Sequence, residues 1–331
     1  MAESYIAGEW SCSNLGELFI TLLSHAPSLN KVLRKYSWLG NILPRFFHSR
    51  RHNSVTSSRN NISKHYDLGN EFYKLFLDDT LCYSSGLFNR DRMGMREASE
   101  QKMKSACEFL KLTADDHLLE IGTGWGGLAV YAAENYGCRV TSTTISKEQF
   151  DFSRALVQTR GLEDRVTIID RDYRELTGTY DKLVSIEMIE AVGYEYLDTF
   201  FTKCSSLLAR DGKMLLQSIL MNDNDYDNYL ASIDFIRYYV FPGGCLPSLK
   251  RIHEINHQQT PFRLIESLDM STSYVRTLEH WLDRFQAAAK QVNDLGYDPS
   301  FQRLWQYYLE YCRAGFSTRH ITVSQMLFER A

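Results

Sequence analysis

Short apolar runs alternate with longer segments of helical periodicity through the middle of the chain. The apolar runs, which predict β-strands, lie at 117–121, 139–143, 166–170, 182–186 and 213–218. Between them, apolar residues recur three and four positions apart, which predicts helices at 127–135, 147–160 and 196–208. This alternation predicts a doubly wound α/β fold, in which a mostly parallel sheet carries helices on both faces.

The pattern changes towards the beginning of the chain. Residues 1–60 predict a small helical N-terminal region and linker, with helical spacing over 15–23 and 29–39. We take residues 61–331 as the main domain, and a further helix is predicted there at 93–110.

The alternation is also interrupted between residues 222 and 290. This region predicts an acidic, aromatic helix over 225–239, a strand over 262–268 and a helix from Leu278. An interruption of this length indicates an insertion that covers a ligand site. The last predicted strand follows at 321–328.

Length and composition fit one main domain with an appendage. The chain has 331 residues, and 44% of them are apolar, enough for a substantial core. It contains no apolar run long enough to span a membrane. None of its seven cysteines forms a CxxC pair, so free cytosolic thiols are favoured over zinc or redox motifs, and we expect no metal site.

Charge is unevenly distributed along a chain whose net charge is −4. No Asp or Glu occurs between Glu17 and Asp67, whereas eight Lys and Arg residues lie in that interval. Residues 48–63 are rich in Ser and Asn, so a solvated linker is one interpretation. A surface that binds anionic phospholipid headgroups is the other. Nucleic acid also fits a basic run, but no accompanying motif supports it.

A glycine-rich turn follows the first predicted strand of the alternating region. Residues 118–128 read LLEIGTGWGGL, an apolar run, a glycine turn and the start of a helical pattern. Glycines permit positive φ and close approach of a ligand to the backbone. The following helix start offers unpaired N–H groups. Alone, this motif predicts only a nucleotide-like ligand.

The residues after the neighbouring strands narrow the ligand. In open α/β sheets the ligand lies beyond the carboxyl ends of the strands. The strand at 139–143 is followed by Thr and Ser, without the lone ribose-binding acid of dehydrogenases, and Asp172 follows the third strand instead. Glu120 stands at the end of the first strand. This arrangement resembles class I S-adenosylmethionine (SAM) methyltransferases.

The sequence resembles one family more closely, the cyclopropane-fatty-acyl-phospholipid synthases. The segment 65–88 begins HYDLGNEFY and ends YSSGLF, and residues 239–248 read YVFPGGCLPS. The other matching stretches are 119–127, 143–149, 172–176 and 185–193. The resemblance covers essentially the whole chain, which we expect to begin later than many members do. It implies the seven-stranded class I methyltransferase fold, with 65–90 as a lid segment.

The resemblance implies a SAM site on the glycine turn. The residues that match its cofactor positions are Tyr83, Ser84, Glu120, Gly122, Gly124, Trp125, Gly126, Thr144, Gln149, Arg171 and Asp172. Thr144 and Gln149 match positions near the ribose hydroxyls, and Arg171 and Asp172 match the adenine side. Tyr83 and Ser84 match positions around the methionine moiety. Taken singly, Tyr83 or Trp125 is equally well explained by packing.

The resemblance also implies a bound bicarbonate ion that acts as the base. The positions that match its ligands are Ser85, Glu190, Gln217, Ile219 and Tyr274. Ser85 replaces a Cys of the family pattern and Gln217 replaces a His. Both can still hydrogen-bond an anion, although the group that titrates near neutral pH is lost. In this scheme Glu190 accepts the bicarbonate O–H, while Tyr274 and Ser85 donate to its oxygens.

The implied activity is methylene transfer from SAM to the cis double bond of an unsaturated phospholipid acyl chain. A carbocation forms and loses a proton, which gives a cyclopropane. Three alternatives stay open: a methyl-branched or methylene product, an alkaloid-type N-methyltransferase, and a non-catalytic SAM- or lipid-binding module. We expect a cytoplasmic protein, peripheral on an anionic membrane surface, with a homodimer as an open alternative and no nucleic-acid partner.

Overall fold

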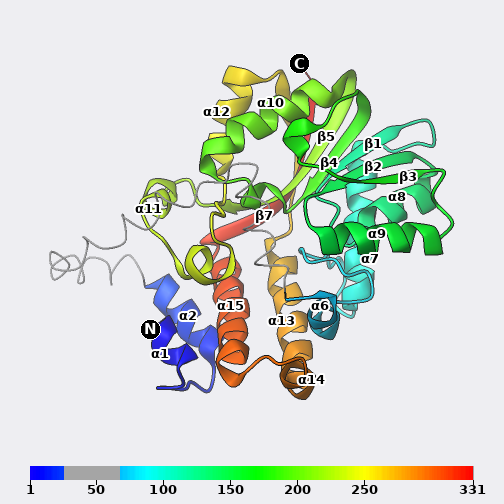
Figure 1. The fold of residues 1–331 in the computed structure, drawn as a ribbon. Helices are drawn as coiled ribbons and strands as arrows, with labels where there is room; N and C mark the ends of the chain where they lie inside the picture. Colours follow the sequence, from blue (N-terminus) through cyan, green and yellow to red (C-terminus); the bar gives the residue numbers. More distant parts are fainter. Residues whose placement is uncertain (26–67, 331) are drawn as a thin grey trace.

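A seven-stranded mixed sheet forms the centre of the computed structural model, which describes residues 1–25 and 68–330 (Figure 1). The strand order is β3-β2-β1-β4-β5-β7-β6. Neighbouring strands from β3 to β5 pair in parallel, and β7 runs antiparallel to both of its neighbours. This is the sheet of class I SAM-dependent methyltransferases, as predicted. The predicted helix at 29–39 and most of the basic interval lie outside the described residues.

The elements follow the predicted alternation closely through the parallel half of the sheet. The strands are β1 His117–Ile121, β2 Arg139–Thr144, β3 Val166–Asp170, β4 Tyr180–Ile186, β5 Leu208–Met221, β6 Phe262–Asp269 and β7 Ile321–Arg330. The helices of this half are α7 Met95–Leu110, α8 Gly127–Tyr136, α9 Lys147–Thr159 and α10 Leu197–Leu207.

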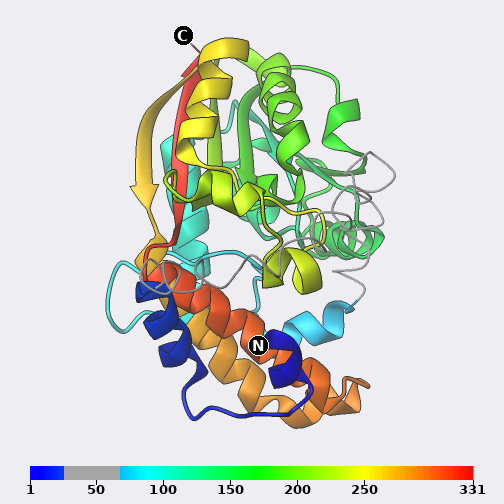
Figure 2. The same cartoon turned by 90° about the vertical axis from the view of Figure 1, so that its left-hand side faces the viewer.

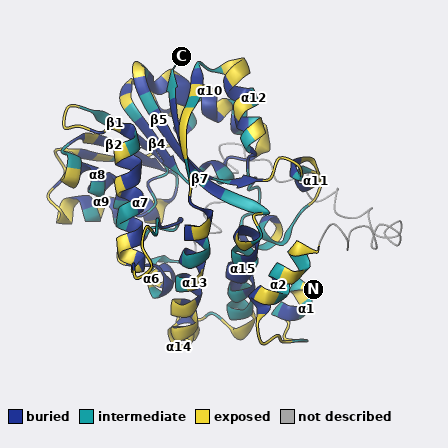
Figure 3. Ribbon diagram, turned by 180° about the vertical axis from the view of Figure 1, so that it is seen from behind, coloured by how far each residue is buried: buried dark blue, intermediate teal, exposed yellow. Residues whose placement is uncertain are grey.

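Apolar side chains cover the two faces of the sheet as separate clusters. On one face, α7, α8 and α9 contribute buried residues such as Leu110, Ala129 and Val157. On the other, α10 and α12 (Leu249–Gln259) contribute residues such as Phe200 and Ile252. Figure 3 shows the strands mostly buried between outer helices whose outward positions are exposed. Burial on both faces explains why the parallel strands are continuous apolar runs.

A helical group lies at one end of the sheet (Figures 1 and 2). It consists of α6 Asn70–Phe76, α13 Ser271–Ala287, α14 Ala289–Asp294 and α15 Pro299–Ser317. A cluster of aromatic side chains, among them Phe72, Trp281 and Trp305, joins these helices. Helices α1 (Ala2–Ile6) and α2 (Leu15–Ser24) pack on α15 through residues such as Phe19 and Tyr307.

Two elements differ from the sequence prediction. The single helix predicted over 225–239 is two short pieces, α11 (Tyr226–Leu230) and the π-helical turn Ile236–Val240. The buried Arg237 donates to the carbonyls of Tyr229 and Ser232 between them, which ends α11 early. Helix α13 begins at Ser271 rather than Leu278, because Asp269 accepts a hydrogen bond from the Ser271 N–H at the helix start.

The region 222–290 does more than cover the site. Part of it is α12 and the edge strand β6, which pairs with β7, so these residues belong to the central layers. Its other parts, α11, the π-helical turn and α13, contribute residues that line a large cavity beside the sheet.

Candidate active site

A cavity of about 1110 Å³ lies at the carboxyl ends of the parallel strands. Its lining includes the glycine turn after β1, the residues after β2, β3 and β4, and side chains of α13 and α15. Ligand pockets commonly have about 300–1,000 Å³. The cavity therefore has room for a nucleotide-sized cofactor and part of a second ligand.

The glycine turn has the backbone conformation that the sequence predicts. Gly122, Gly124 and Gly126 have φ values of 100°, 54° and 87°, a region that L side chains rarely adopt. A Cβ on Gly122 would lie 2.9 Å from the Cβ of Met188, in the loop after β4. A Cβ on Gly124 would meet no atom within 4 Å. The turn thus presents open backbone to the cavity.

Glu120 holds the base of this turn to the neighbouring strand. Its buried carboxylate accepts a hydrogen bond from the hydroxyl of Ser142, and the hydroxyls of Ser142 and Thr123 are 2.7 Å apart. Burial raises the pKa of Glu120 to about 8. Because Glu120 also lines the cavity, its predicted cofactor role and a role in fixing the turn are compatible.

Trp125 connects the glycine turn to the helical group. Its indole N–H donates to the side-chain oxygen of Asn70 at 2.8 Å, and its ring centroid lies 4.8 Å from that of Tyr73. Both partners belong to α6, the helix of the predicted lid segment that lies within the described residues. Trp125 therefore packs as well as lining the cavity.

Tyr83 and Ser84 line the same cavity. The hydroxyls of Tyr83 and Tyr308 are 2.9 Å apart. The ammonium group of Lys102, a buried residue of α7, donates to the Ser84 hydroxyl at 2.8 Å. The sequence prediction missed Lys102, which places a cation beside the expected methionine moiety.

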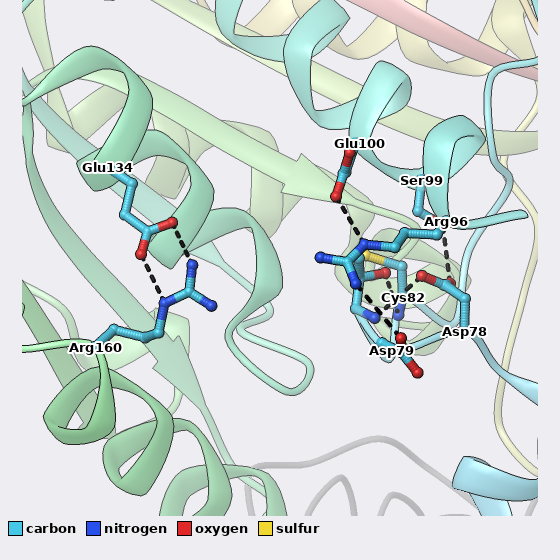
Figure 4. A network of polar contacts seen from close by, with 9 residues as sticks. Asp78, Asp79, Cys82, Arg96, Ser99, Glu100, Glu134 and Arg160 are labelled. Carbon is cyan, nitrogen blue, oxygen red and sulfur yellow. Dashed lines mark hydrogen bonds and ion pairs between the residues drawn. The ribbon is translucent and has the colours of Figure 1, made fainter.

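A polar network fixes the turn that precedes Tyr83 (Figure 4). The carboxylate of Asp78 accepts from the Ser99 hydroxyl and from the Thr80 N–H, each at 3.0 Å. Arg96 bridges Asp79 and Glu100 on the surface of α7. These contacts attach residues 78–80, just before Tyr83, to α7.

The residues expected at the ribose and adenine sides line the same cavity. The hydroxyl of Thr144 donates to the Gln149 side-chain oxygen at 2.9 Å. The buried Asp172 forms a two-point ion pair with Arg174, with distances of 2.9 and 2.7 Å. Arg171 is exposed, and its N–H donates to the Thr144 carbonyl at 3.1 Å. All four predicted positions are thus brought together.

The predicted base site is organised around Glu187, which the sequence prediction did not include. Its carboxylate accepts hydrogen bonds from the Ser85 N–H at 2.9 Å, the Gln217 amide at 2.7 Å and the Tyr274 hydroxyl at 2.7 Å. Three of the five residues expected to hold bicarbonate therefore contact this carboxylate. The Ser85 hydroxyl donates elsewhere, to the Gly86 carbonyl.

Glu190 and Ile219 form the second part of this site. One carboxylate oxygen of Glu190 accepts from the Ile219 N–H at 2.6 Å and from the Ser218 hydroxyl at 3.0 Å. The other oxygen, Oε2, is buried without a hydrogen-bond partner among the described residues. Burial, and then the charge of Glu187, raise the pKa of Glu190 to about 8.

Burial also raises the pKa of Glu187, but the three donors and the nearby Lys102 ammonium oppose this effect. Each donor presents a hydrogen to a carboxylate oxygen, an arrangement that favours the ionised form. Both pKa values are therefore raised: that of Glu190 reaches about 8, while the three donors and Lys102 limit the rise of the pKa of Glu187.

Glu187 has a second distinguishing property, a positive φ of 46°. This conformation is uncommon for non-glycine residues and costs of order 1–3 kcal/mol, so it persists only where surrounding contacts hold it. The only sequence signal for Glu187 was its place directly after a buried strand, where ligand-binding residues gather.

Two further properties bear on the class of protein. Within residues 1–25 and 68–330, no three His, Cys, Asp or Glu side chains are grouped so that they could hold a metal ion. No helix of the described residues is both long and apolar enough to cross a membrane.

Comparison with known proteins identifies the family. Residues 53–326 match the family model for mycolic acid cyclopropane synthetase. The chain is 36% identical to the tuberculostearic acid methyltransferase of Mycobacterium tuberculosis, over 98% of this chain and 77% of that protein. It is 34% identical to the cyclopropane-fatty-acyl-phospholipid synthase of Escherichia coli K12, over 100% of this chain and 82% of that protein.

A solved structure agrees with these matches. The mycolic acid cyclopropane synthase CmaA1 in complex with SAH (S-adenosylhomocysteine) and CTAB superposes with a TM-score of 0.77 at 30% identity, covering 82% of this chain and 98% of that one. The family match, the sheet order and the glycine turn agree. The chain therefore belongs to the cyclopropane-fatty-acyl-phospholipid synthase family and is a SAM-dependent methyltransferase.

Proposed function

We propose that this enzyme transfers a methylene group from SAM to the cis double bond of an unsaturated phospholipid acyl chain, which gives a cyclopropane fatty acid. One observation carries the proposal: a single cavity joins the glycine turn to a pair of partly buried carboxyl groups, Glu187 and Glu190. The lining of the cavity also contains apolar side chains, including Ile219, Leu278 and Phe316. An acyl chain fits such a wall, and the reaction needs a base beside it.

In this proposal the backbone of Gly122 and Gly124 supports SAM, and Thr144 and Gln149 lie beside its ribose. Ser84 and Lys102 lie beside its methionine end, where the ammonium of Lys102 complements a carboxylate. When SAM is bound, the π electrons of the alkene form a bond to its methyl carbon, and the carbon–sulfur electron pair leaves on sulfur. The acyl chain is left with a carbocation. The protein's part is to orient the two reactants and to accept a proton.

The cradle residues do not fit an additional bicarbonate ion as they stand. Ser85, Gln217 and Tyr274 direct their donors at the Glu187 carboxylate, so three of the five expected ligands are already engaged. The proposal therefore includes no bicarbonate step. Glu190 stands beside Glu187 as a second carboxyl near the developing positive charge.

The double bond reaches this site from a membrane surface in our proposal. The basic interval between Glu17 and Asp67 is the segment that we expect to contact anionic headgroups, each cation contributing about 1 kcal/mol near such a surface. Binding to anionic vesicles should weaken as salt rises, since exposed charges are screened. Equal binding to neutral vesicles would contradict this part. A homodimer stays an open alternative.

A methylene or methyl-branched product is the second candidate, because one relative is a tuberculostearic acid methyltransferase. A hydride shift followed by loss of a proton from the methyl group would give the methylene product from the same carbocation, and proton loss from a neighbouring chain carbon would give a methyl-branched unsaturated chain. The likeness to a coclaurine N-methyltransferase structure, at 21% identity and a TM-score of 0.72, shows the fold alone.

Lipid mass spectrometry of cells that express the protein tests the proposal. We expect unsaturated phospholipid acyl chains to gain one carbon and two hydrogens. Hydrogenation then distinguishes the two products, because it reduces a methylene group to a methyl branch and leaves a cyclopropane ring distinct from it. Glu163→Gln, a substitution at an exposed surface position, serves as the active control. Unchanged acyl chains in cells that contain folded protein would contradict the proposed function.

A further inference from the structure

We propose that the carboxylate of Glu187 is the resident base of this enzyme and occupies the place that a bicarbonate ion would otherwise take. This inference rests on the proposed function, because it concerns the proton that the carbocation must lose. Its central observation is the set of three donors, from three separate segments, that converge on one side-chain carboxylate.

The donors come from parts of the chain that are far apart in sequence. Ser85 precedes α7, Gln217 lies in β5 and Tyr274 lies in α13. All three residues are buried. A buried anion is stable only when its oxygens are hydrogen-bonded, and the cradle meets that requirement for a carboxylate. A carboxylate and a bicarbonate ion present similar planar oxygens, so one cradle suits either.

The orientation of Gln217 is itself fixed. Its side-chain oxygen accepts a hydrogen bond from the Gln325 amide at 3.0 Å, which leaves its own NH₂ group to donate to Glu187. Gln325 is held in turn by the Ser105 hydroxyl at 2.7 Å. This chain of donors runs from α7 through β7 and β5 to Glu187. The Gln217 amide is neutral, so its NH₂ group donates a hydrogen bond to Glu187 without transferring a proton to the carboxylate.

The backbone also brings Glu187 into the cradle. Its positive φ of 46° turns the chain sharply after β4, while its N–H donates to the Gln217 carbonyl at 2.8 Å. A glycine would adopt this conformation without strain. The strained non-glycine residue at this position is compatible with a side chain that has a function there.

The proton transfer balances without another reactant. The Glu187 carboxylate takes a proton from the transferred methyl group, and the electron pair of that carbon–hydrogen bond forms the second ring bond to the cationic carbon. Glu187 becomes a neutral carboxylic acid and later returns the proton to water. Lys102 and Glu190, the ionisable neighbours of Glu187, take no part in this proton transfer.

Two substitutions separate this role from a structural one. Glu187→Gln fills the cradle with a group that cannot accept the proton, and Glu187→Gly empties the cradle at a backbone angle suited to glycine. Each should lower product formation by about 10²–10⁴-fold, the usual contribution of a general base. The affinity for SAM, measured by calorimetry, should stay near that of the wild type, and melting temperatures check that both variants fold.

Chemical rescue and bicarbonate binding decide the identity of the base. Added bicarbonate or formate should restore product formation in Glu187→Gly but not in Glu187→Gln. ¹³C NMR with labelled bicarbonate should show binding to Glu187→Gly and no binding to the wild type. Wild-type turnover should be equal in carbon dioxide-free and bicarbonate-supplemented buffer.

Bicarbonate bound to the wild-type enzyme, wild-type turnover that requires bicarbonate, or a fully active Glu187→Gln variant would each overturn the inference. The NMR measurement needs no turnover. If the wild type modified no lipid, the proposed function would fail. The NMR measurement would still show whether Glu187 or bicarbonate occupies the cradle.

Discussion

At the scale of single residues, the two halves of the site differ in how they are built. The cofactor half relies on backbone, because the glycine turn leaves open space beside Gly124. The acidic half relies on side chains, because donors from three segments meet at Glu187. Substitutions should therefore separate cofactor binding from proton removal.

Gly124→Val should greatly weaken SAM binding, since a branched side chain would enter the cavity at a φ of 54°. Isothermal calorimetry measures the loss. Gly161→Val is the matched control: Gly161 also has a positive φ and open space around its Cβ, but it lies outside the cavity lining. That variant should lose stability and keep its SAM affinity. Unchanged affinity in Gly124→Val would show that SAM binds elsewhere.

Glu190→Gln should abolish product formation while SAM still binds. The glutamine oxygen can keep the hydrogen bonds from Ile219 and Ser218, so the fold is preserved and the carboxyl group alone is lost. We expect a fall of about 10²-fold in lipid product, measured by mass spectrometry, because Glu190 lies beside the developing charge without being the proton acceptor. Full activity in this variant would remove Glu190 from the mechanism.

At the scale of elements, the apolar pattern determined the parallel half of the sheet well. Its strands are buried on both faces, and their sequences are continuous apolar runs with little ambiguity. The helical group was predicted poorly. Helix α15 was not singled out, and α13 was begun too late, because their aromatic faces pack on other helices at positions that local spacing does not reveal.

The same distinction holds for the site. Asp172 could be placed by the rule that ligands bind at strand ends, and Glu190 by the family resemblance. Lys102 and Gln325 could not, because each reads as an ordinary member of a helix or strand until the fold brings it to the site. Glu187 was overlooked because its partners are far away in sequence.

Gln325→Leu tests the connection between β7 and the cradle. Without the Gln325 donor, the Gln217 amide is free to turn its NH₂ group away from Glu187. Product formation should fall by up to about 10²-fold while SAM affinity is kept. Ser105→Ala, which removes only the outer hydrogen bond of the chain, should have a smaller effect. Equal, wild-type rates in both variants would show that Gln217 needs no such support.

At the scale of the whole molecule, the buried acids make stability depend on pH. The pKa values of Glu120 and Glu190 are raised to about 8 in the folded protein, whereas an unfolded Glu titrates near pH ~4.3. Between these values the folded state binds more protons than the unfolded state. Stability should therefore fall as pH rises through this window, by up to about 1.4 kcal/mol per pH unit for each group.

Denaturant unfolding at several pH values measures this slope. Other groups contribute to the wild-type curve, so the comparison with Glu190→Gln is the informative one. That variant should lose less stability than the wild type between pH 5 and pH 8. Parallel curves for the two proteins would mean that Glu190 is not buried as an acid.

The proposed reaction is defined by where the methyl group goes. The measurement that tests this most directly is incubation of the purified enzyme with unsaturated phospholipid vesicles and SAM whose methyl group carries three deuterium atoms. We predict that the acyl chain gains the labelled carbon and that one deuterium is lost to the base. Label on the headgroup with all three deuterium atoms retained, or an unlabelled lipid beside newly formed SAH, would contradict it.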